Sequence, residues 1–177
     1  MINQDRLLQR FLRYVRINTA ADPQSQAYPS TESQRELGKM LADELTQMGL
    51  TDVVLDEHAV VTATVPSTID GTAPTVALVA HMDTSPEAPS ESVDPQVVQS
   101  YSGGDISLPS GNAITVAGCP DLEKMIGHTL VTTDGSTLLG GDDKAGVAII
   151  MELAEALVEN PHVPHGPVRV VMTCDEE

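Results

Sequence analysis

Three clusters of histidine and carboxylate side chains lie where apolar runs of the sequence meet polar segments. The clusters are His81-Met82-Asp83, Gly140-Gly141-Asp142-Asp143-Lys144 and Asp175-Glu176-Glu177. Open α/β sheets bind ligands beyond the carboxyl ends of their strands, so we expect the three clusters to meet at one edge of a sheet.

The first cluster has the spacing of a carboxylate–histidine relay. Alternate side chains of an extended segment lie on the same face, so Asp83 could hold one imidazole nitrogen of His81 while the other nitrogen binds a metal ion. Taken alone, an H-x-D pair is more often an ordinary polar contact.

The other two clusters contain adjacent carboxylates, which repel each other unless a cation or the positive end of a helix offsets their charge. Asp142 and Asp143 beside two glycines are also compatible with a helix N-cap in a glycine-rich turn, and Glu176 and Glu177 with a solvated chain end. The coincidence of three such clusters in one chain favours a common site.

Together the clusters offer ligands that suit zinc. Two zinc ions roughly 3.5 to 4 Å apart need imidazole and carboxylate ligands, one bridging carboxylate and a free base. The clusters supply one imidazole, one bridge and one terminal carboxylate, but no second histidine or further carboxylate can be identified. Cys174 is best explained by packing. A surface or capping role is expected for the remaining histidines, His58, His128, His162 and His165.

Two amphipathic helices are expected ahead of the first cluster. Apolar residues recur at three- and four-residue steps over 3–16 and 37–48, and Gly49 supplies a stop for the second helix. A capping box of Thr31 with Gln34, or of Ser33 with Glu36, would begin that helix.

The strands that should position the clusters are short and apolar. β-branched runs lie at 52–55 and 60–65, and the runs at 75–80 and 168–173 predict strands that are buried on both faces. A long irregular excursion over 84–120, a strand at 130–133 and a helix over 145–157 complete the pattern. Strands separated by helices predict the α/β class, with a mostly parallel or mixed sheet flanked by helices.

The composition restricts the classes of partner. Nine Lys and Arg against 26 Asp and Glu give a formal net charge of −17, which repels phosphate backbones and anionic lipids. Three Tyr, one Phe and no Trp leave few surfaces on which bases could stack. Neither nucleic acid nor a membrane is therefore expected as a partner.

Neither a signal peptide nor a membrane span is expected in the first 20 residues. Residues 1–20 lack the continuous apolar core of a signal peptide, and no apolar run reaches the roughly 18 residues of a membrane span. The two cysteines, Cys119 and Cys174, have no C-x-x-C spacing. A cytosolic location is expected.

Longer segments resemble the tripeptide aminopeptidases of the M20 family of two-zinc metallopeptidases. The matching segments are 29–32, 81–87, 132–146, 164–166 and 175–177. The segment TTDGSTLLGGDDKAG at 132–146 is the most specific. The resemblance runs along nearly the whole chain, with departures at Gly141, where alanine is usual, and at Cys174, where proline is usual.

The resemblance implies a role for each residue of the clusters. His81 would bind one zinc ion, Glu177 would bind the other, and Asp142 would bridge both. Asp83 would orient His81, and Glu176 would be the general base that takes a proton from the zinc-bridging water and passes it to the leaving amine. A cis peptide bond between Asp142 and Asp143 is also implied.

The resemblance further implies that residues 1–177 are the amino-terminal portion of a catalytic domain. Family members continue to a further Asp ligand, an inserted smaller domain and a late His ligand. We therefore expect the isolated chain to be inactive, and to be poorly soluble or self-associating because part of its sheet is uncovered.

The expected function is zinc-dependent release of the N-terminal residue from tripeptides. The cofactor would be two Zn²⁺ ions per complete active site, the partners would be small peptides, and the full-length protein is compatible with a homodimer. Two alternatives stay open: another M20 amidohydrolase, such as a dipeptidase or deacetylase, and a short non-catalytic protein that binds one metal ion weakly.

Overall fold

The computed structural model of the protein describes residues 2–177. The helices are α1 (Gln4–Tyr14), α2 (Glu32–Gln47), the short 3₁₀ helix η1 (Pro120–Met125) and α3 (Gly141–Glu159). The strands are β1 (Thr51–Leu55), β2 (Val61–Val65), β3 (Val76–His81), β4 (Gln96–Val98), β5 (Ile106–Ser107), β6 (Ala113–Ile114), β7 (Leu130–Thr132) and β8 (Val168–Thr173).

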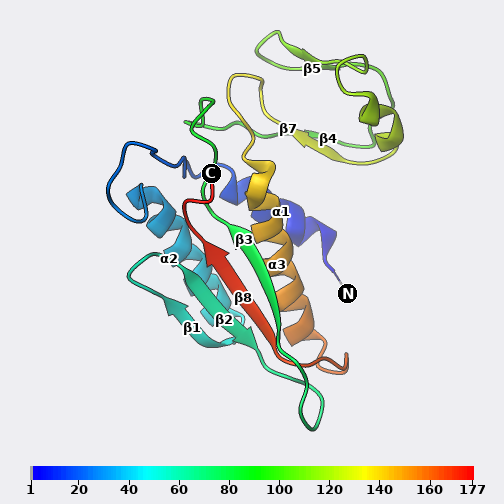
Figure 1. Cartoon of the computed structure of the whole chain (residues 1–177). Coiled ribbons are helices and arrows are strands. Elements are labelled where there is room, and N and C mark those ends of the chain that lie inside the picture. The colour runs from blue at the N-terminus through cyan, green and yellow to red at the C-terminus, as the bar shows by residue number, and fades with distance from the viewer. Residues whose placement is uncertain (1) are drawn as a thin grey trace.

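A four-stranded sheet in the order β1-β2-β8-β3 forms the centre of the molecule (Figure 1). The pairs β1–β2 and β2–β8 are antiparallel, and β3–β8 is parallel. The predicted α/β fold with a sheet flanked by helices is confirmed, in its mixed form. The sheet is not mostly parallel, because β1 and β2 are joined by a short connection that only antiparallel neighbours allow.

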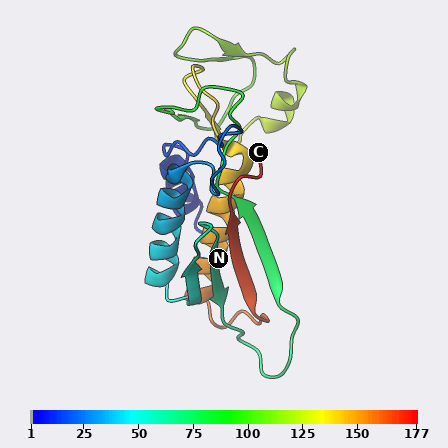
Figure 2. The ribbon, with the colours of Figure 1, turned by 60° about the vertical axis from the view of Figure 1, so that its left-hand side comes forward.

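The helices gather on one face of this sheet, and the other face is uncovered (Figure 2). Val61, Ala63 and Val65 of β2 are buried on the helical side, whereas Thr62 and Thr64 alternate toward the open side. The prediction that the strands at 75–80 and 168–173 are buried on both faces is therefore wrong. Val79, on the open face of the edge strand β3, keeps 60% of its surface exposed.

The core forms between the sheet and the apolar stripes of α2 and α3. Leu37, Leu41 and Leu45 recur every four residues on α2, so they share one helical face, and each is fully buried. Fully burying one such leucine contributes about 1.5 to 3 kcal/mol. Gly38 lets α2 approach the sheet closely, because a Cβ atom there would lie 3.3 Å from the carbonyl oxygen of Ala59.

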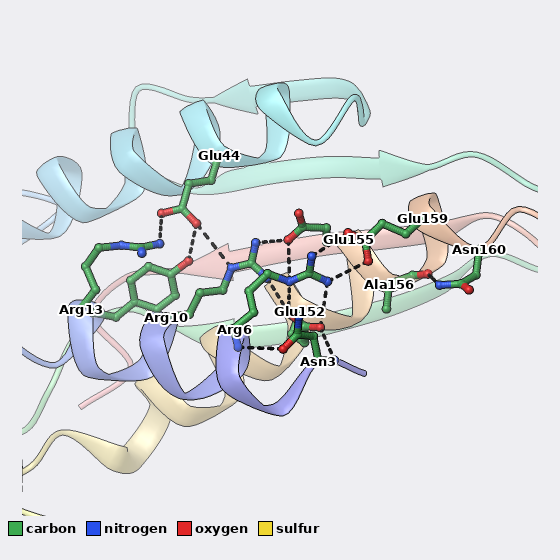
Figure 3. Close-up of polar contacts among 11 residues, drawn as sticks. Asn3, Arg6, Arg10, Arg13, Glu44, Glu152, Glu155, Ala156, Glu159 and Asn160 are labelled. Carbon is green, nitrogen blue, oxygen red and sulfur yellow. Dashed lines mark hydrogen bonds and ion pairs between the residues drawn. The ribbon is translucent and has the colours of Figure 1, made fainter. Parts of the chain in front are cut away.

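Charged side chains connect α1 to α3. Arg6 and Arg10 of α1 bind Glu152 and Glu155 of α3, and Glu152 is almost completely buried (Figure 3). The side chain of Asn3 accepts a hydrogen bond from the backbone N–H of Arg6 and begins α1, close to the predicted start. Polar contacts thus join two helices that both lie on the same side of the sheet.

The segment between β3 and α3 lies beyond the carboxyl end of β3 (Figure 1). It was expected to be irregular over 84–120, but it contains the antiparallel pairs β4–β7 and β5–β6, and η1. Tyr101, Ile106 and Leu122 form a small core of their own. These strands are two or three residues long, too short for an alternating pattern in the sequence. The strand predicted at 130–133 is confirmed as β7.

No helix of residues 2–177 combines the length and the apolar character that a membrane span requires.

Candidate metal centre

The carboxyl ends of the parallel strands β3 and β8 bring two of the three clusters to the same edge of the sheet. His81 pairs in register with Thr173, so the segment after each strand starts at the same level. The amino-terminal end of α3, which carries the third cluster, lies at this edge as well (Figure 1). The meeting of the clusters follows from strand direction and helix placement.

Both ring nitrogens of His81 face oxygen atoms. Nε2 lies 3.1 Å from Oδ1 of Asp142, and Nδ1 lies 3.1 Å from the backbone oxygen of Asp83 and 3.5 Å from its Oδ1 atom. A neutral imidazole that donates from Nδ1 presents the lone pair of Nε2 to a carboxylate. A proton or a metal cation between these two atoms would relieve that repulsion.

The negative surroundings of His81 change its basicity. Burial by itself would lower the pKa of His81, but the hydrogen bond to Asp142 and the charges of Asp83, Asp143 and Glu176 outweigh burial and raise the pKa above its ordinary value. The surroundings of His81 therefore favour positive charge.

Asp83 connects the histidine to the end of β8. Its side chain is fully buried, and Oδ2 accepts hydrogen bonds from the backbone N–H groups of Glu176 (3.0 Å) and Glu177 (2.9 Å). Oδ1 is buried without a hydrogen-bond partner and lies nearest to the His81 ring. The bond that orients the ring comes from the backbone oxygen of Asp83, whereas its carboxylate holds the acidic terminus in place.

The two aspartates at the start of α3 point in different directions. Oδ1 of Asp143 accepts a hydrogen bond from the backbone N–H of Gly146 (3.0 Å). The backbone of Asp142 and Asp143 is not helical, so Asp143 caps the regular part of α3 that follows. A Cβ atom on Gly146 would lie 2.3 Å from Oδ1 of Asp143, so a larger residue there would displace the carboxylate of Asp143. Asp142 instead faces His81, and the peptide bond between the two aspartates is cis, as the resemblance implies. The N-cap interpretation of the cluster therefore describes Asp143, while Asp142 is turned toward His81.

The two glutamates after β8 occupy different surroundings. Oε2 of Glu176 lies 3.8 Å from Nε2 of His81, and its side chain is 65% exposed. Glu177 lines a small pocket with Tyr28, Ser30 and Asp175. The structure thus brings together the side chains of His81, Asp142 and Glu176, while Glu177 contributes its backbone N–H to the network around Asp83. Within residues 2–177, no three His, Cys, Asp or Glu side chains form a ligand set for one metal ion.

Lys144 belongs to the second cluster, but no role was predicted for it, and the structure places it within reach of the charge of Asp83. Its side chain is buried and Nζ donates to the backbone oxygen of Ile17 at 2.6 Å. Burial lowers the pKa of Lys144 to about 8, although the charge of Asp83 opposes this shift. Its helical phase with the buried residues Val147 and Met151 was the available signal.

The remaining candidates lie outside the centre. Cys174 belongs to the hydrophobic core, where burial first and the charge of Asp175 second raise the pKa of its thiol to about 12. His58, His128 and His162 are exposed, and His165 bonds the backbone oxygen of Gly166. The roles that were expected for Cys174 and these histidines are consistent with those positions.

Comparison with known proteins identifies relatives over nearly the whole chain. No protein-family model matches it. Peptidase T of Alkaliphilus oremlandii is 49% identical over 175 residues, which cover 97% of this chain and 43% of that protein. Peptidase T of Geobacillus kaustophilus is 47% identical over 173 residues, which cover 97% of this chain and 42% of that protein.

Comparison with solved structures also identifies similar peptidases. Aminopeptidase PepT of Bacillus cereus superposes with a TM-score of 0.67 at 26% identity, covering 98% of this chain and 37% of that one. A tripeptidase of Staphylococcus aureus gives a TM-score of 0.66 at 28% identity, covering 99% of this chain and 38% of that one. The expected resemblance to tripeptide aminopeptidases is confirmed: the chain is similar to peptidase T along 97% of its own length and spans about two fifths of the length of those curated relatives.

Proposed function

We propose that the polypeptide carrying this chain is a metal-dependent aminopeptidase that releases the N-terminal residue from tripeptides. Residues 1–177 would form the amino-terminal part of its catalytic domain. The observation that carries the proposal is the 3.1 Å approach of His81 Nε2 to Asp142 Oδ1 at the carboxyl edge of the sheet. The similarity to peptidase T and to a solved tripeptidase supports the choice of reaction.

The donor set fits zinc. Imidazole nitrogen and carboxylate oxygen are the ligands that zinc prefers, and His81 and Asp142 present one of each, with their polar atoms turned toward one another. His81 would hold one zinc ion, Asp142 would bridge to a second, and Glu177 would hold the second. Two Zn²⁺ ions would polarise the substrate carbonyl and lower the pKa of water.

The residues of this chain would contribute orientation and proton transfer. The backbone oxygen of Asp83 keeps the His81 ring turned toward Asp142, as an outer partner of a metal-bound histidine does. Oε2 of Glu176 lies 3.8 Å from Nε2 of His81 and the side chain is largely exposed, so Glu176 would be accessible to a substrate at this pair. It would take a proton from the attacking water and pass it to the leaving amine.

The partners follow from the same proposal. Small peptides would be the substrates, and the protein would act in the cytosol. The net charge of −17 argues against phosphate-rich partners. A homodimer of the complete polypeptide belongs to the proposal as well.

The test uses the complete polypeptide encoded by the reading frame that contains this chain. Purified with zinc, it should release the first residue of a tripeptide with a free amino terminus and spare the N-acetylated tripeptide. Glu176→Gln should lower kcat by roughly 10²- to 10⁴-fold, the range for loss of a general base, while metal content is unchanged. The matched control is Glu123→Gln, at an exposed position on η1.

The same assay separates the alternatives. Preferred cleavage of dipeptides or of N-acetylated amino acids would identify another M20 amidohydrolase. A polypeptide that binds zinc but hydrolyses none of these substrates would reject the proposal and favour a non-catalytic metal-binding protein.

A further inference from the structure

The turn after β8 has an unusual backbone. Asp175 has a φ of +52°, a left-handed conformation that non-glycine residues adopt infrequently and that Asp tolerates better than most. Such a conformation persists where the surrounding structure holds it in place. The two residues that follow are Glu176 and Glu177, so this turn decides how both glutamates leave the sheet.

The side chain of Gln34 on α2 binds Asp175 from both ends of its amide. Nε2 donates to Oδ1 of Asp175 at 2.6 Å, and Oε1 accepts from the backbone N–H of Asp175 at 3.1 Å. Gln34 is completely buried, so this amide has no access to water. Thr31 is the N-cap residue of α2, but the predicted capping box with Gln34 does not form, because the Thr31 side chain makes no cap bond. The amide of Gln34 donates to Thr31 Oγ1 at 3.2 Å as well as to Asp175.

Ser30 also donates hydrogen bonds to the carboxylate of Asp175. Its backbone N–H donates to Oδ2 of Asp175 at 2.7 Å, and its hydroxyl donates to Oδ1. Nε2 of Gln34 also donates to the Ser30 hydroxyl oxygen at 3.2 Å. All three donors come from 30–34, a segment more than 140 residues from Asp175 in the sequence.

A second anchor acts one residue later. The buried carboxylate of Asp83 accepts from the backbone N–H groups of Glu176 and Glu177. The chain is thus held on one side by Gln34 and Ser30 through the side chain of Asp175, and on the other by Asp83 through the backbone. Between these two anchors, Oε2 of Glu176 lies 3.8 Å from Nε2 of His81.

We infer that Gln34 and Ser30 are positioning residues of the active site, which act through Asp175 to orient Glu176 and Glu177. The inference rests on the proposed function, because it assigns these residues an effect on the carboxylates that would perform it. Neither residue lies at the centre itself, and both act through hydrogen bonds to Asp175. Outer partners that orient active-site groups affect activity by roughly 10- to 100-fold.

The test exchanges donor and acceptor between Gln34 and Asp175 in the complete polypeptide. Gln34→Glu replaces the donating amide by a carboxylate that faces Oδ1 of Asp175, and should lower kcat for tripeptide cleavage roughly 10- to 100-fold with little change in KM. Adding Asp175→Asn supplies a side-chain N–H that can donate to the carboxylate introduced by Gln34→Glu. The side-chain oxygen that remains at position 175 can still accept from the backbone N–H of Ser30. The double variant should recover most of the lost kcat.

Two further variants make the result interpretable. Gln47→Glu makes the same chemical change at an exposed position on the same helix and should leave kcat unchanged. Ser30→Ala removes one hydroxyl and should lower kcat in the same direction, so it carries the test if Gln34→Glu fails to fold. Melting temperatures, recorded for every variant, distinguish a variant that fails to fold from a folded variant in which Glu176 is displaced.

The outcomes distinguish the two proposals. A wild-type polypeptide that cleaves no tripeptide contradicts the proposed function. An active wild type together with a folded Gln34→Glu variant of unchanged kcat contradicts the positioning role alone. A folded double variant that recovers no activity also contradicts the positioning role, because a restored hydrogen bond between positions 34 and 175 should return Glu176 to its place.

Discussion

Oδ1 of Asp142 lies 3.1 Å from Nε2 of His81, although 61 positions separate the two residues in the sequence. The imidazole is buried and held from behind by the backbone of Asp83, whereas the side chain of Asp142 is 86% exposed. One partner is therefore fixed and the other is open to solvent. This combination leaves the contact accessible to a cation from outside.

Removing either partner should remove a zinc site. In the complete polypeptide, His81→Ala and Asp142→Asn should each weaken zinc binding by more than the roughly 10- to 100-fold that loss of an outer partner costs. Isothermal titration with zinc measures this effect. His128→Ala, at an exposed histidine that has no hydrogen bond or ion pair with the side chains of the centre within residues 2–177, should leave the titration unchanged. Equal binding by His81→Ala and wild type would refute the assignment.

The chain of 177 residues alone should be inactive toward tripeptides, even with added zinc. Zinc takes about four ligands, and His81 with Asp142 provides two facing donors. An incomplete pair of sites cannot hold the attacking water between two cations. A coupled assay for the released amino acid checks this expectation, and turnover that is abolished by Glu176→Gln would contradict it.

Asp83 should matter for stability as well as for the site. Asp83→Ala leaves the backbone N–H groups of Glu176 and Glu177 without their acceptor, which should cost about 2 to 3 kcal/mol of unfolding free energy. Asp83→Asn keeps one oxygen that can accept both bonds and should cost clearly less. Urea denaturation of the three proteins gives the comparison, and equal losses in both variants would argue against this role.

The stability of the α1–α3 contact should depend on acid. Burial alone would raise the pKa of Glu152, but the hydrogen bonds from Arg6 and Asn3 outweigh it and lower the pKa below the ordinary 4.5. Since the ionised form is favoured in the folded state, its contribution is complete above pH 4.5 and is lost as the pH falls through the lowered value.

Glu152→Gln should therefore destabilise the protein at pH 7, by about 3 kcal/mol because Arg10 is buried beside it, and should flatten the loss of stability below pH 4.5. Chemical denaturation across this pH range is the measurement. Glu159→Gln removes an exposed partner of Arg6 and should have a much smaller effect at pH 7. An equal effect of the two variants would show that burial of Glu152 is not decisive.

The open face of the sheet should promote self-association of the isolated chain. Val54, Thr62, Val171 and Val79 form one cross-strand row on that face. Val79→Thr combined with Val171→Thr keeps the β-branched shape and removes apolar surface, so it should lower the average mass in sedimentation velocity. Val158→Thr, at a partly exposed site on α3, is the control. A monodisperse monomer of the unmodified chain would contradict the expectation.

Much of the fold was predictable because local periodicity reflects local burial. The leucines of α2 repeat every four residues, and Gly49, which takes a positive φ, ends that helix as predicted. β3 and β8 were placed correctly from their apolar runs. The exposure of these two strands was predicted wrongly, because an apolar run predicts a strand but does not show whether one or both of its faces are covered.

The amino-acid sequence alone supplied the residue types of the centre, the N-cap interpretation that fits Asp143, and the resemblance that implies roles for the other residues. Which distant atoms meet can be read only from the folded chain: Asp142 faces His81, Asp83 accepts from two backbone N–H groups, and Gln34 binds Asp175. These contacts join segments 61 to 141 positions apart. Their geometry depends on strand order and helix placement, which no local pattern encodes.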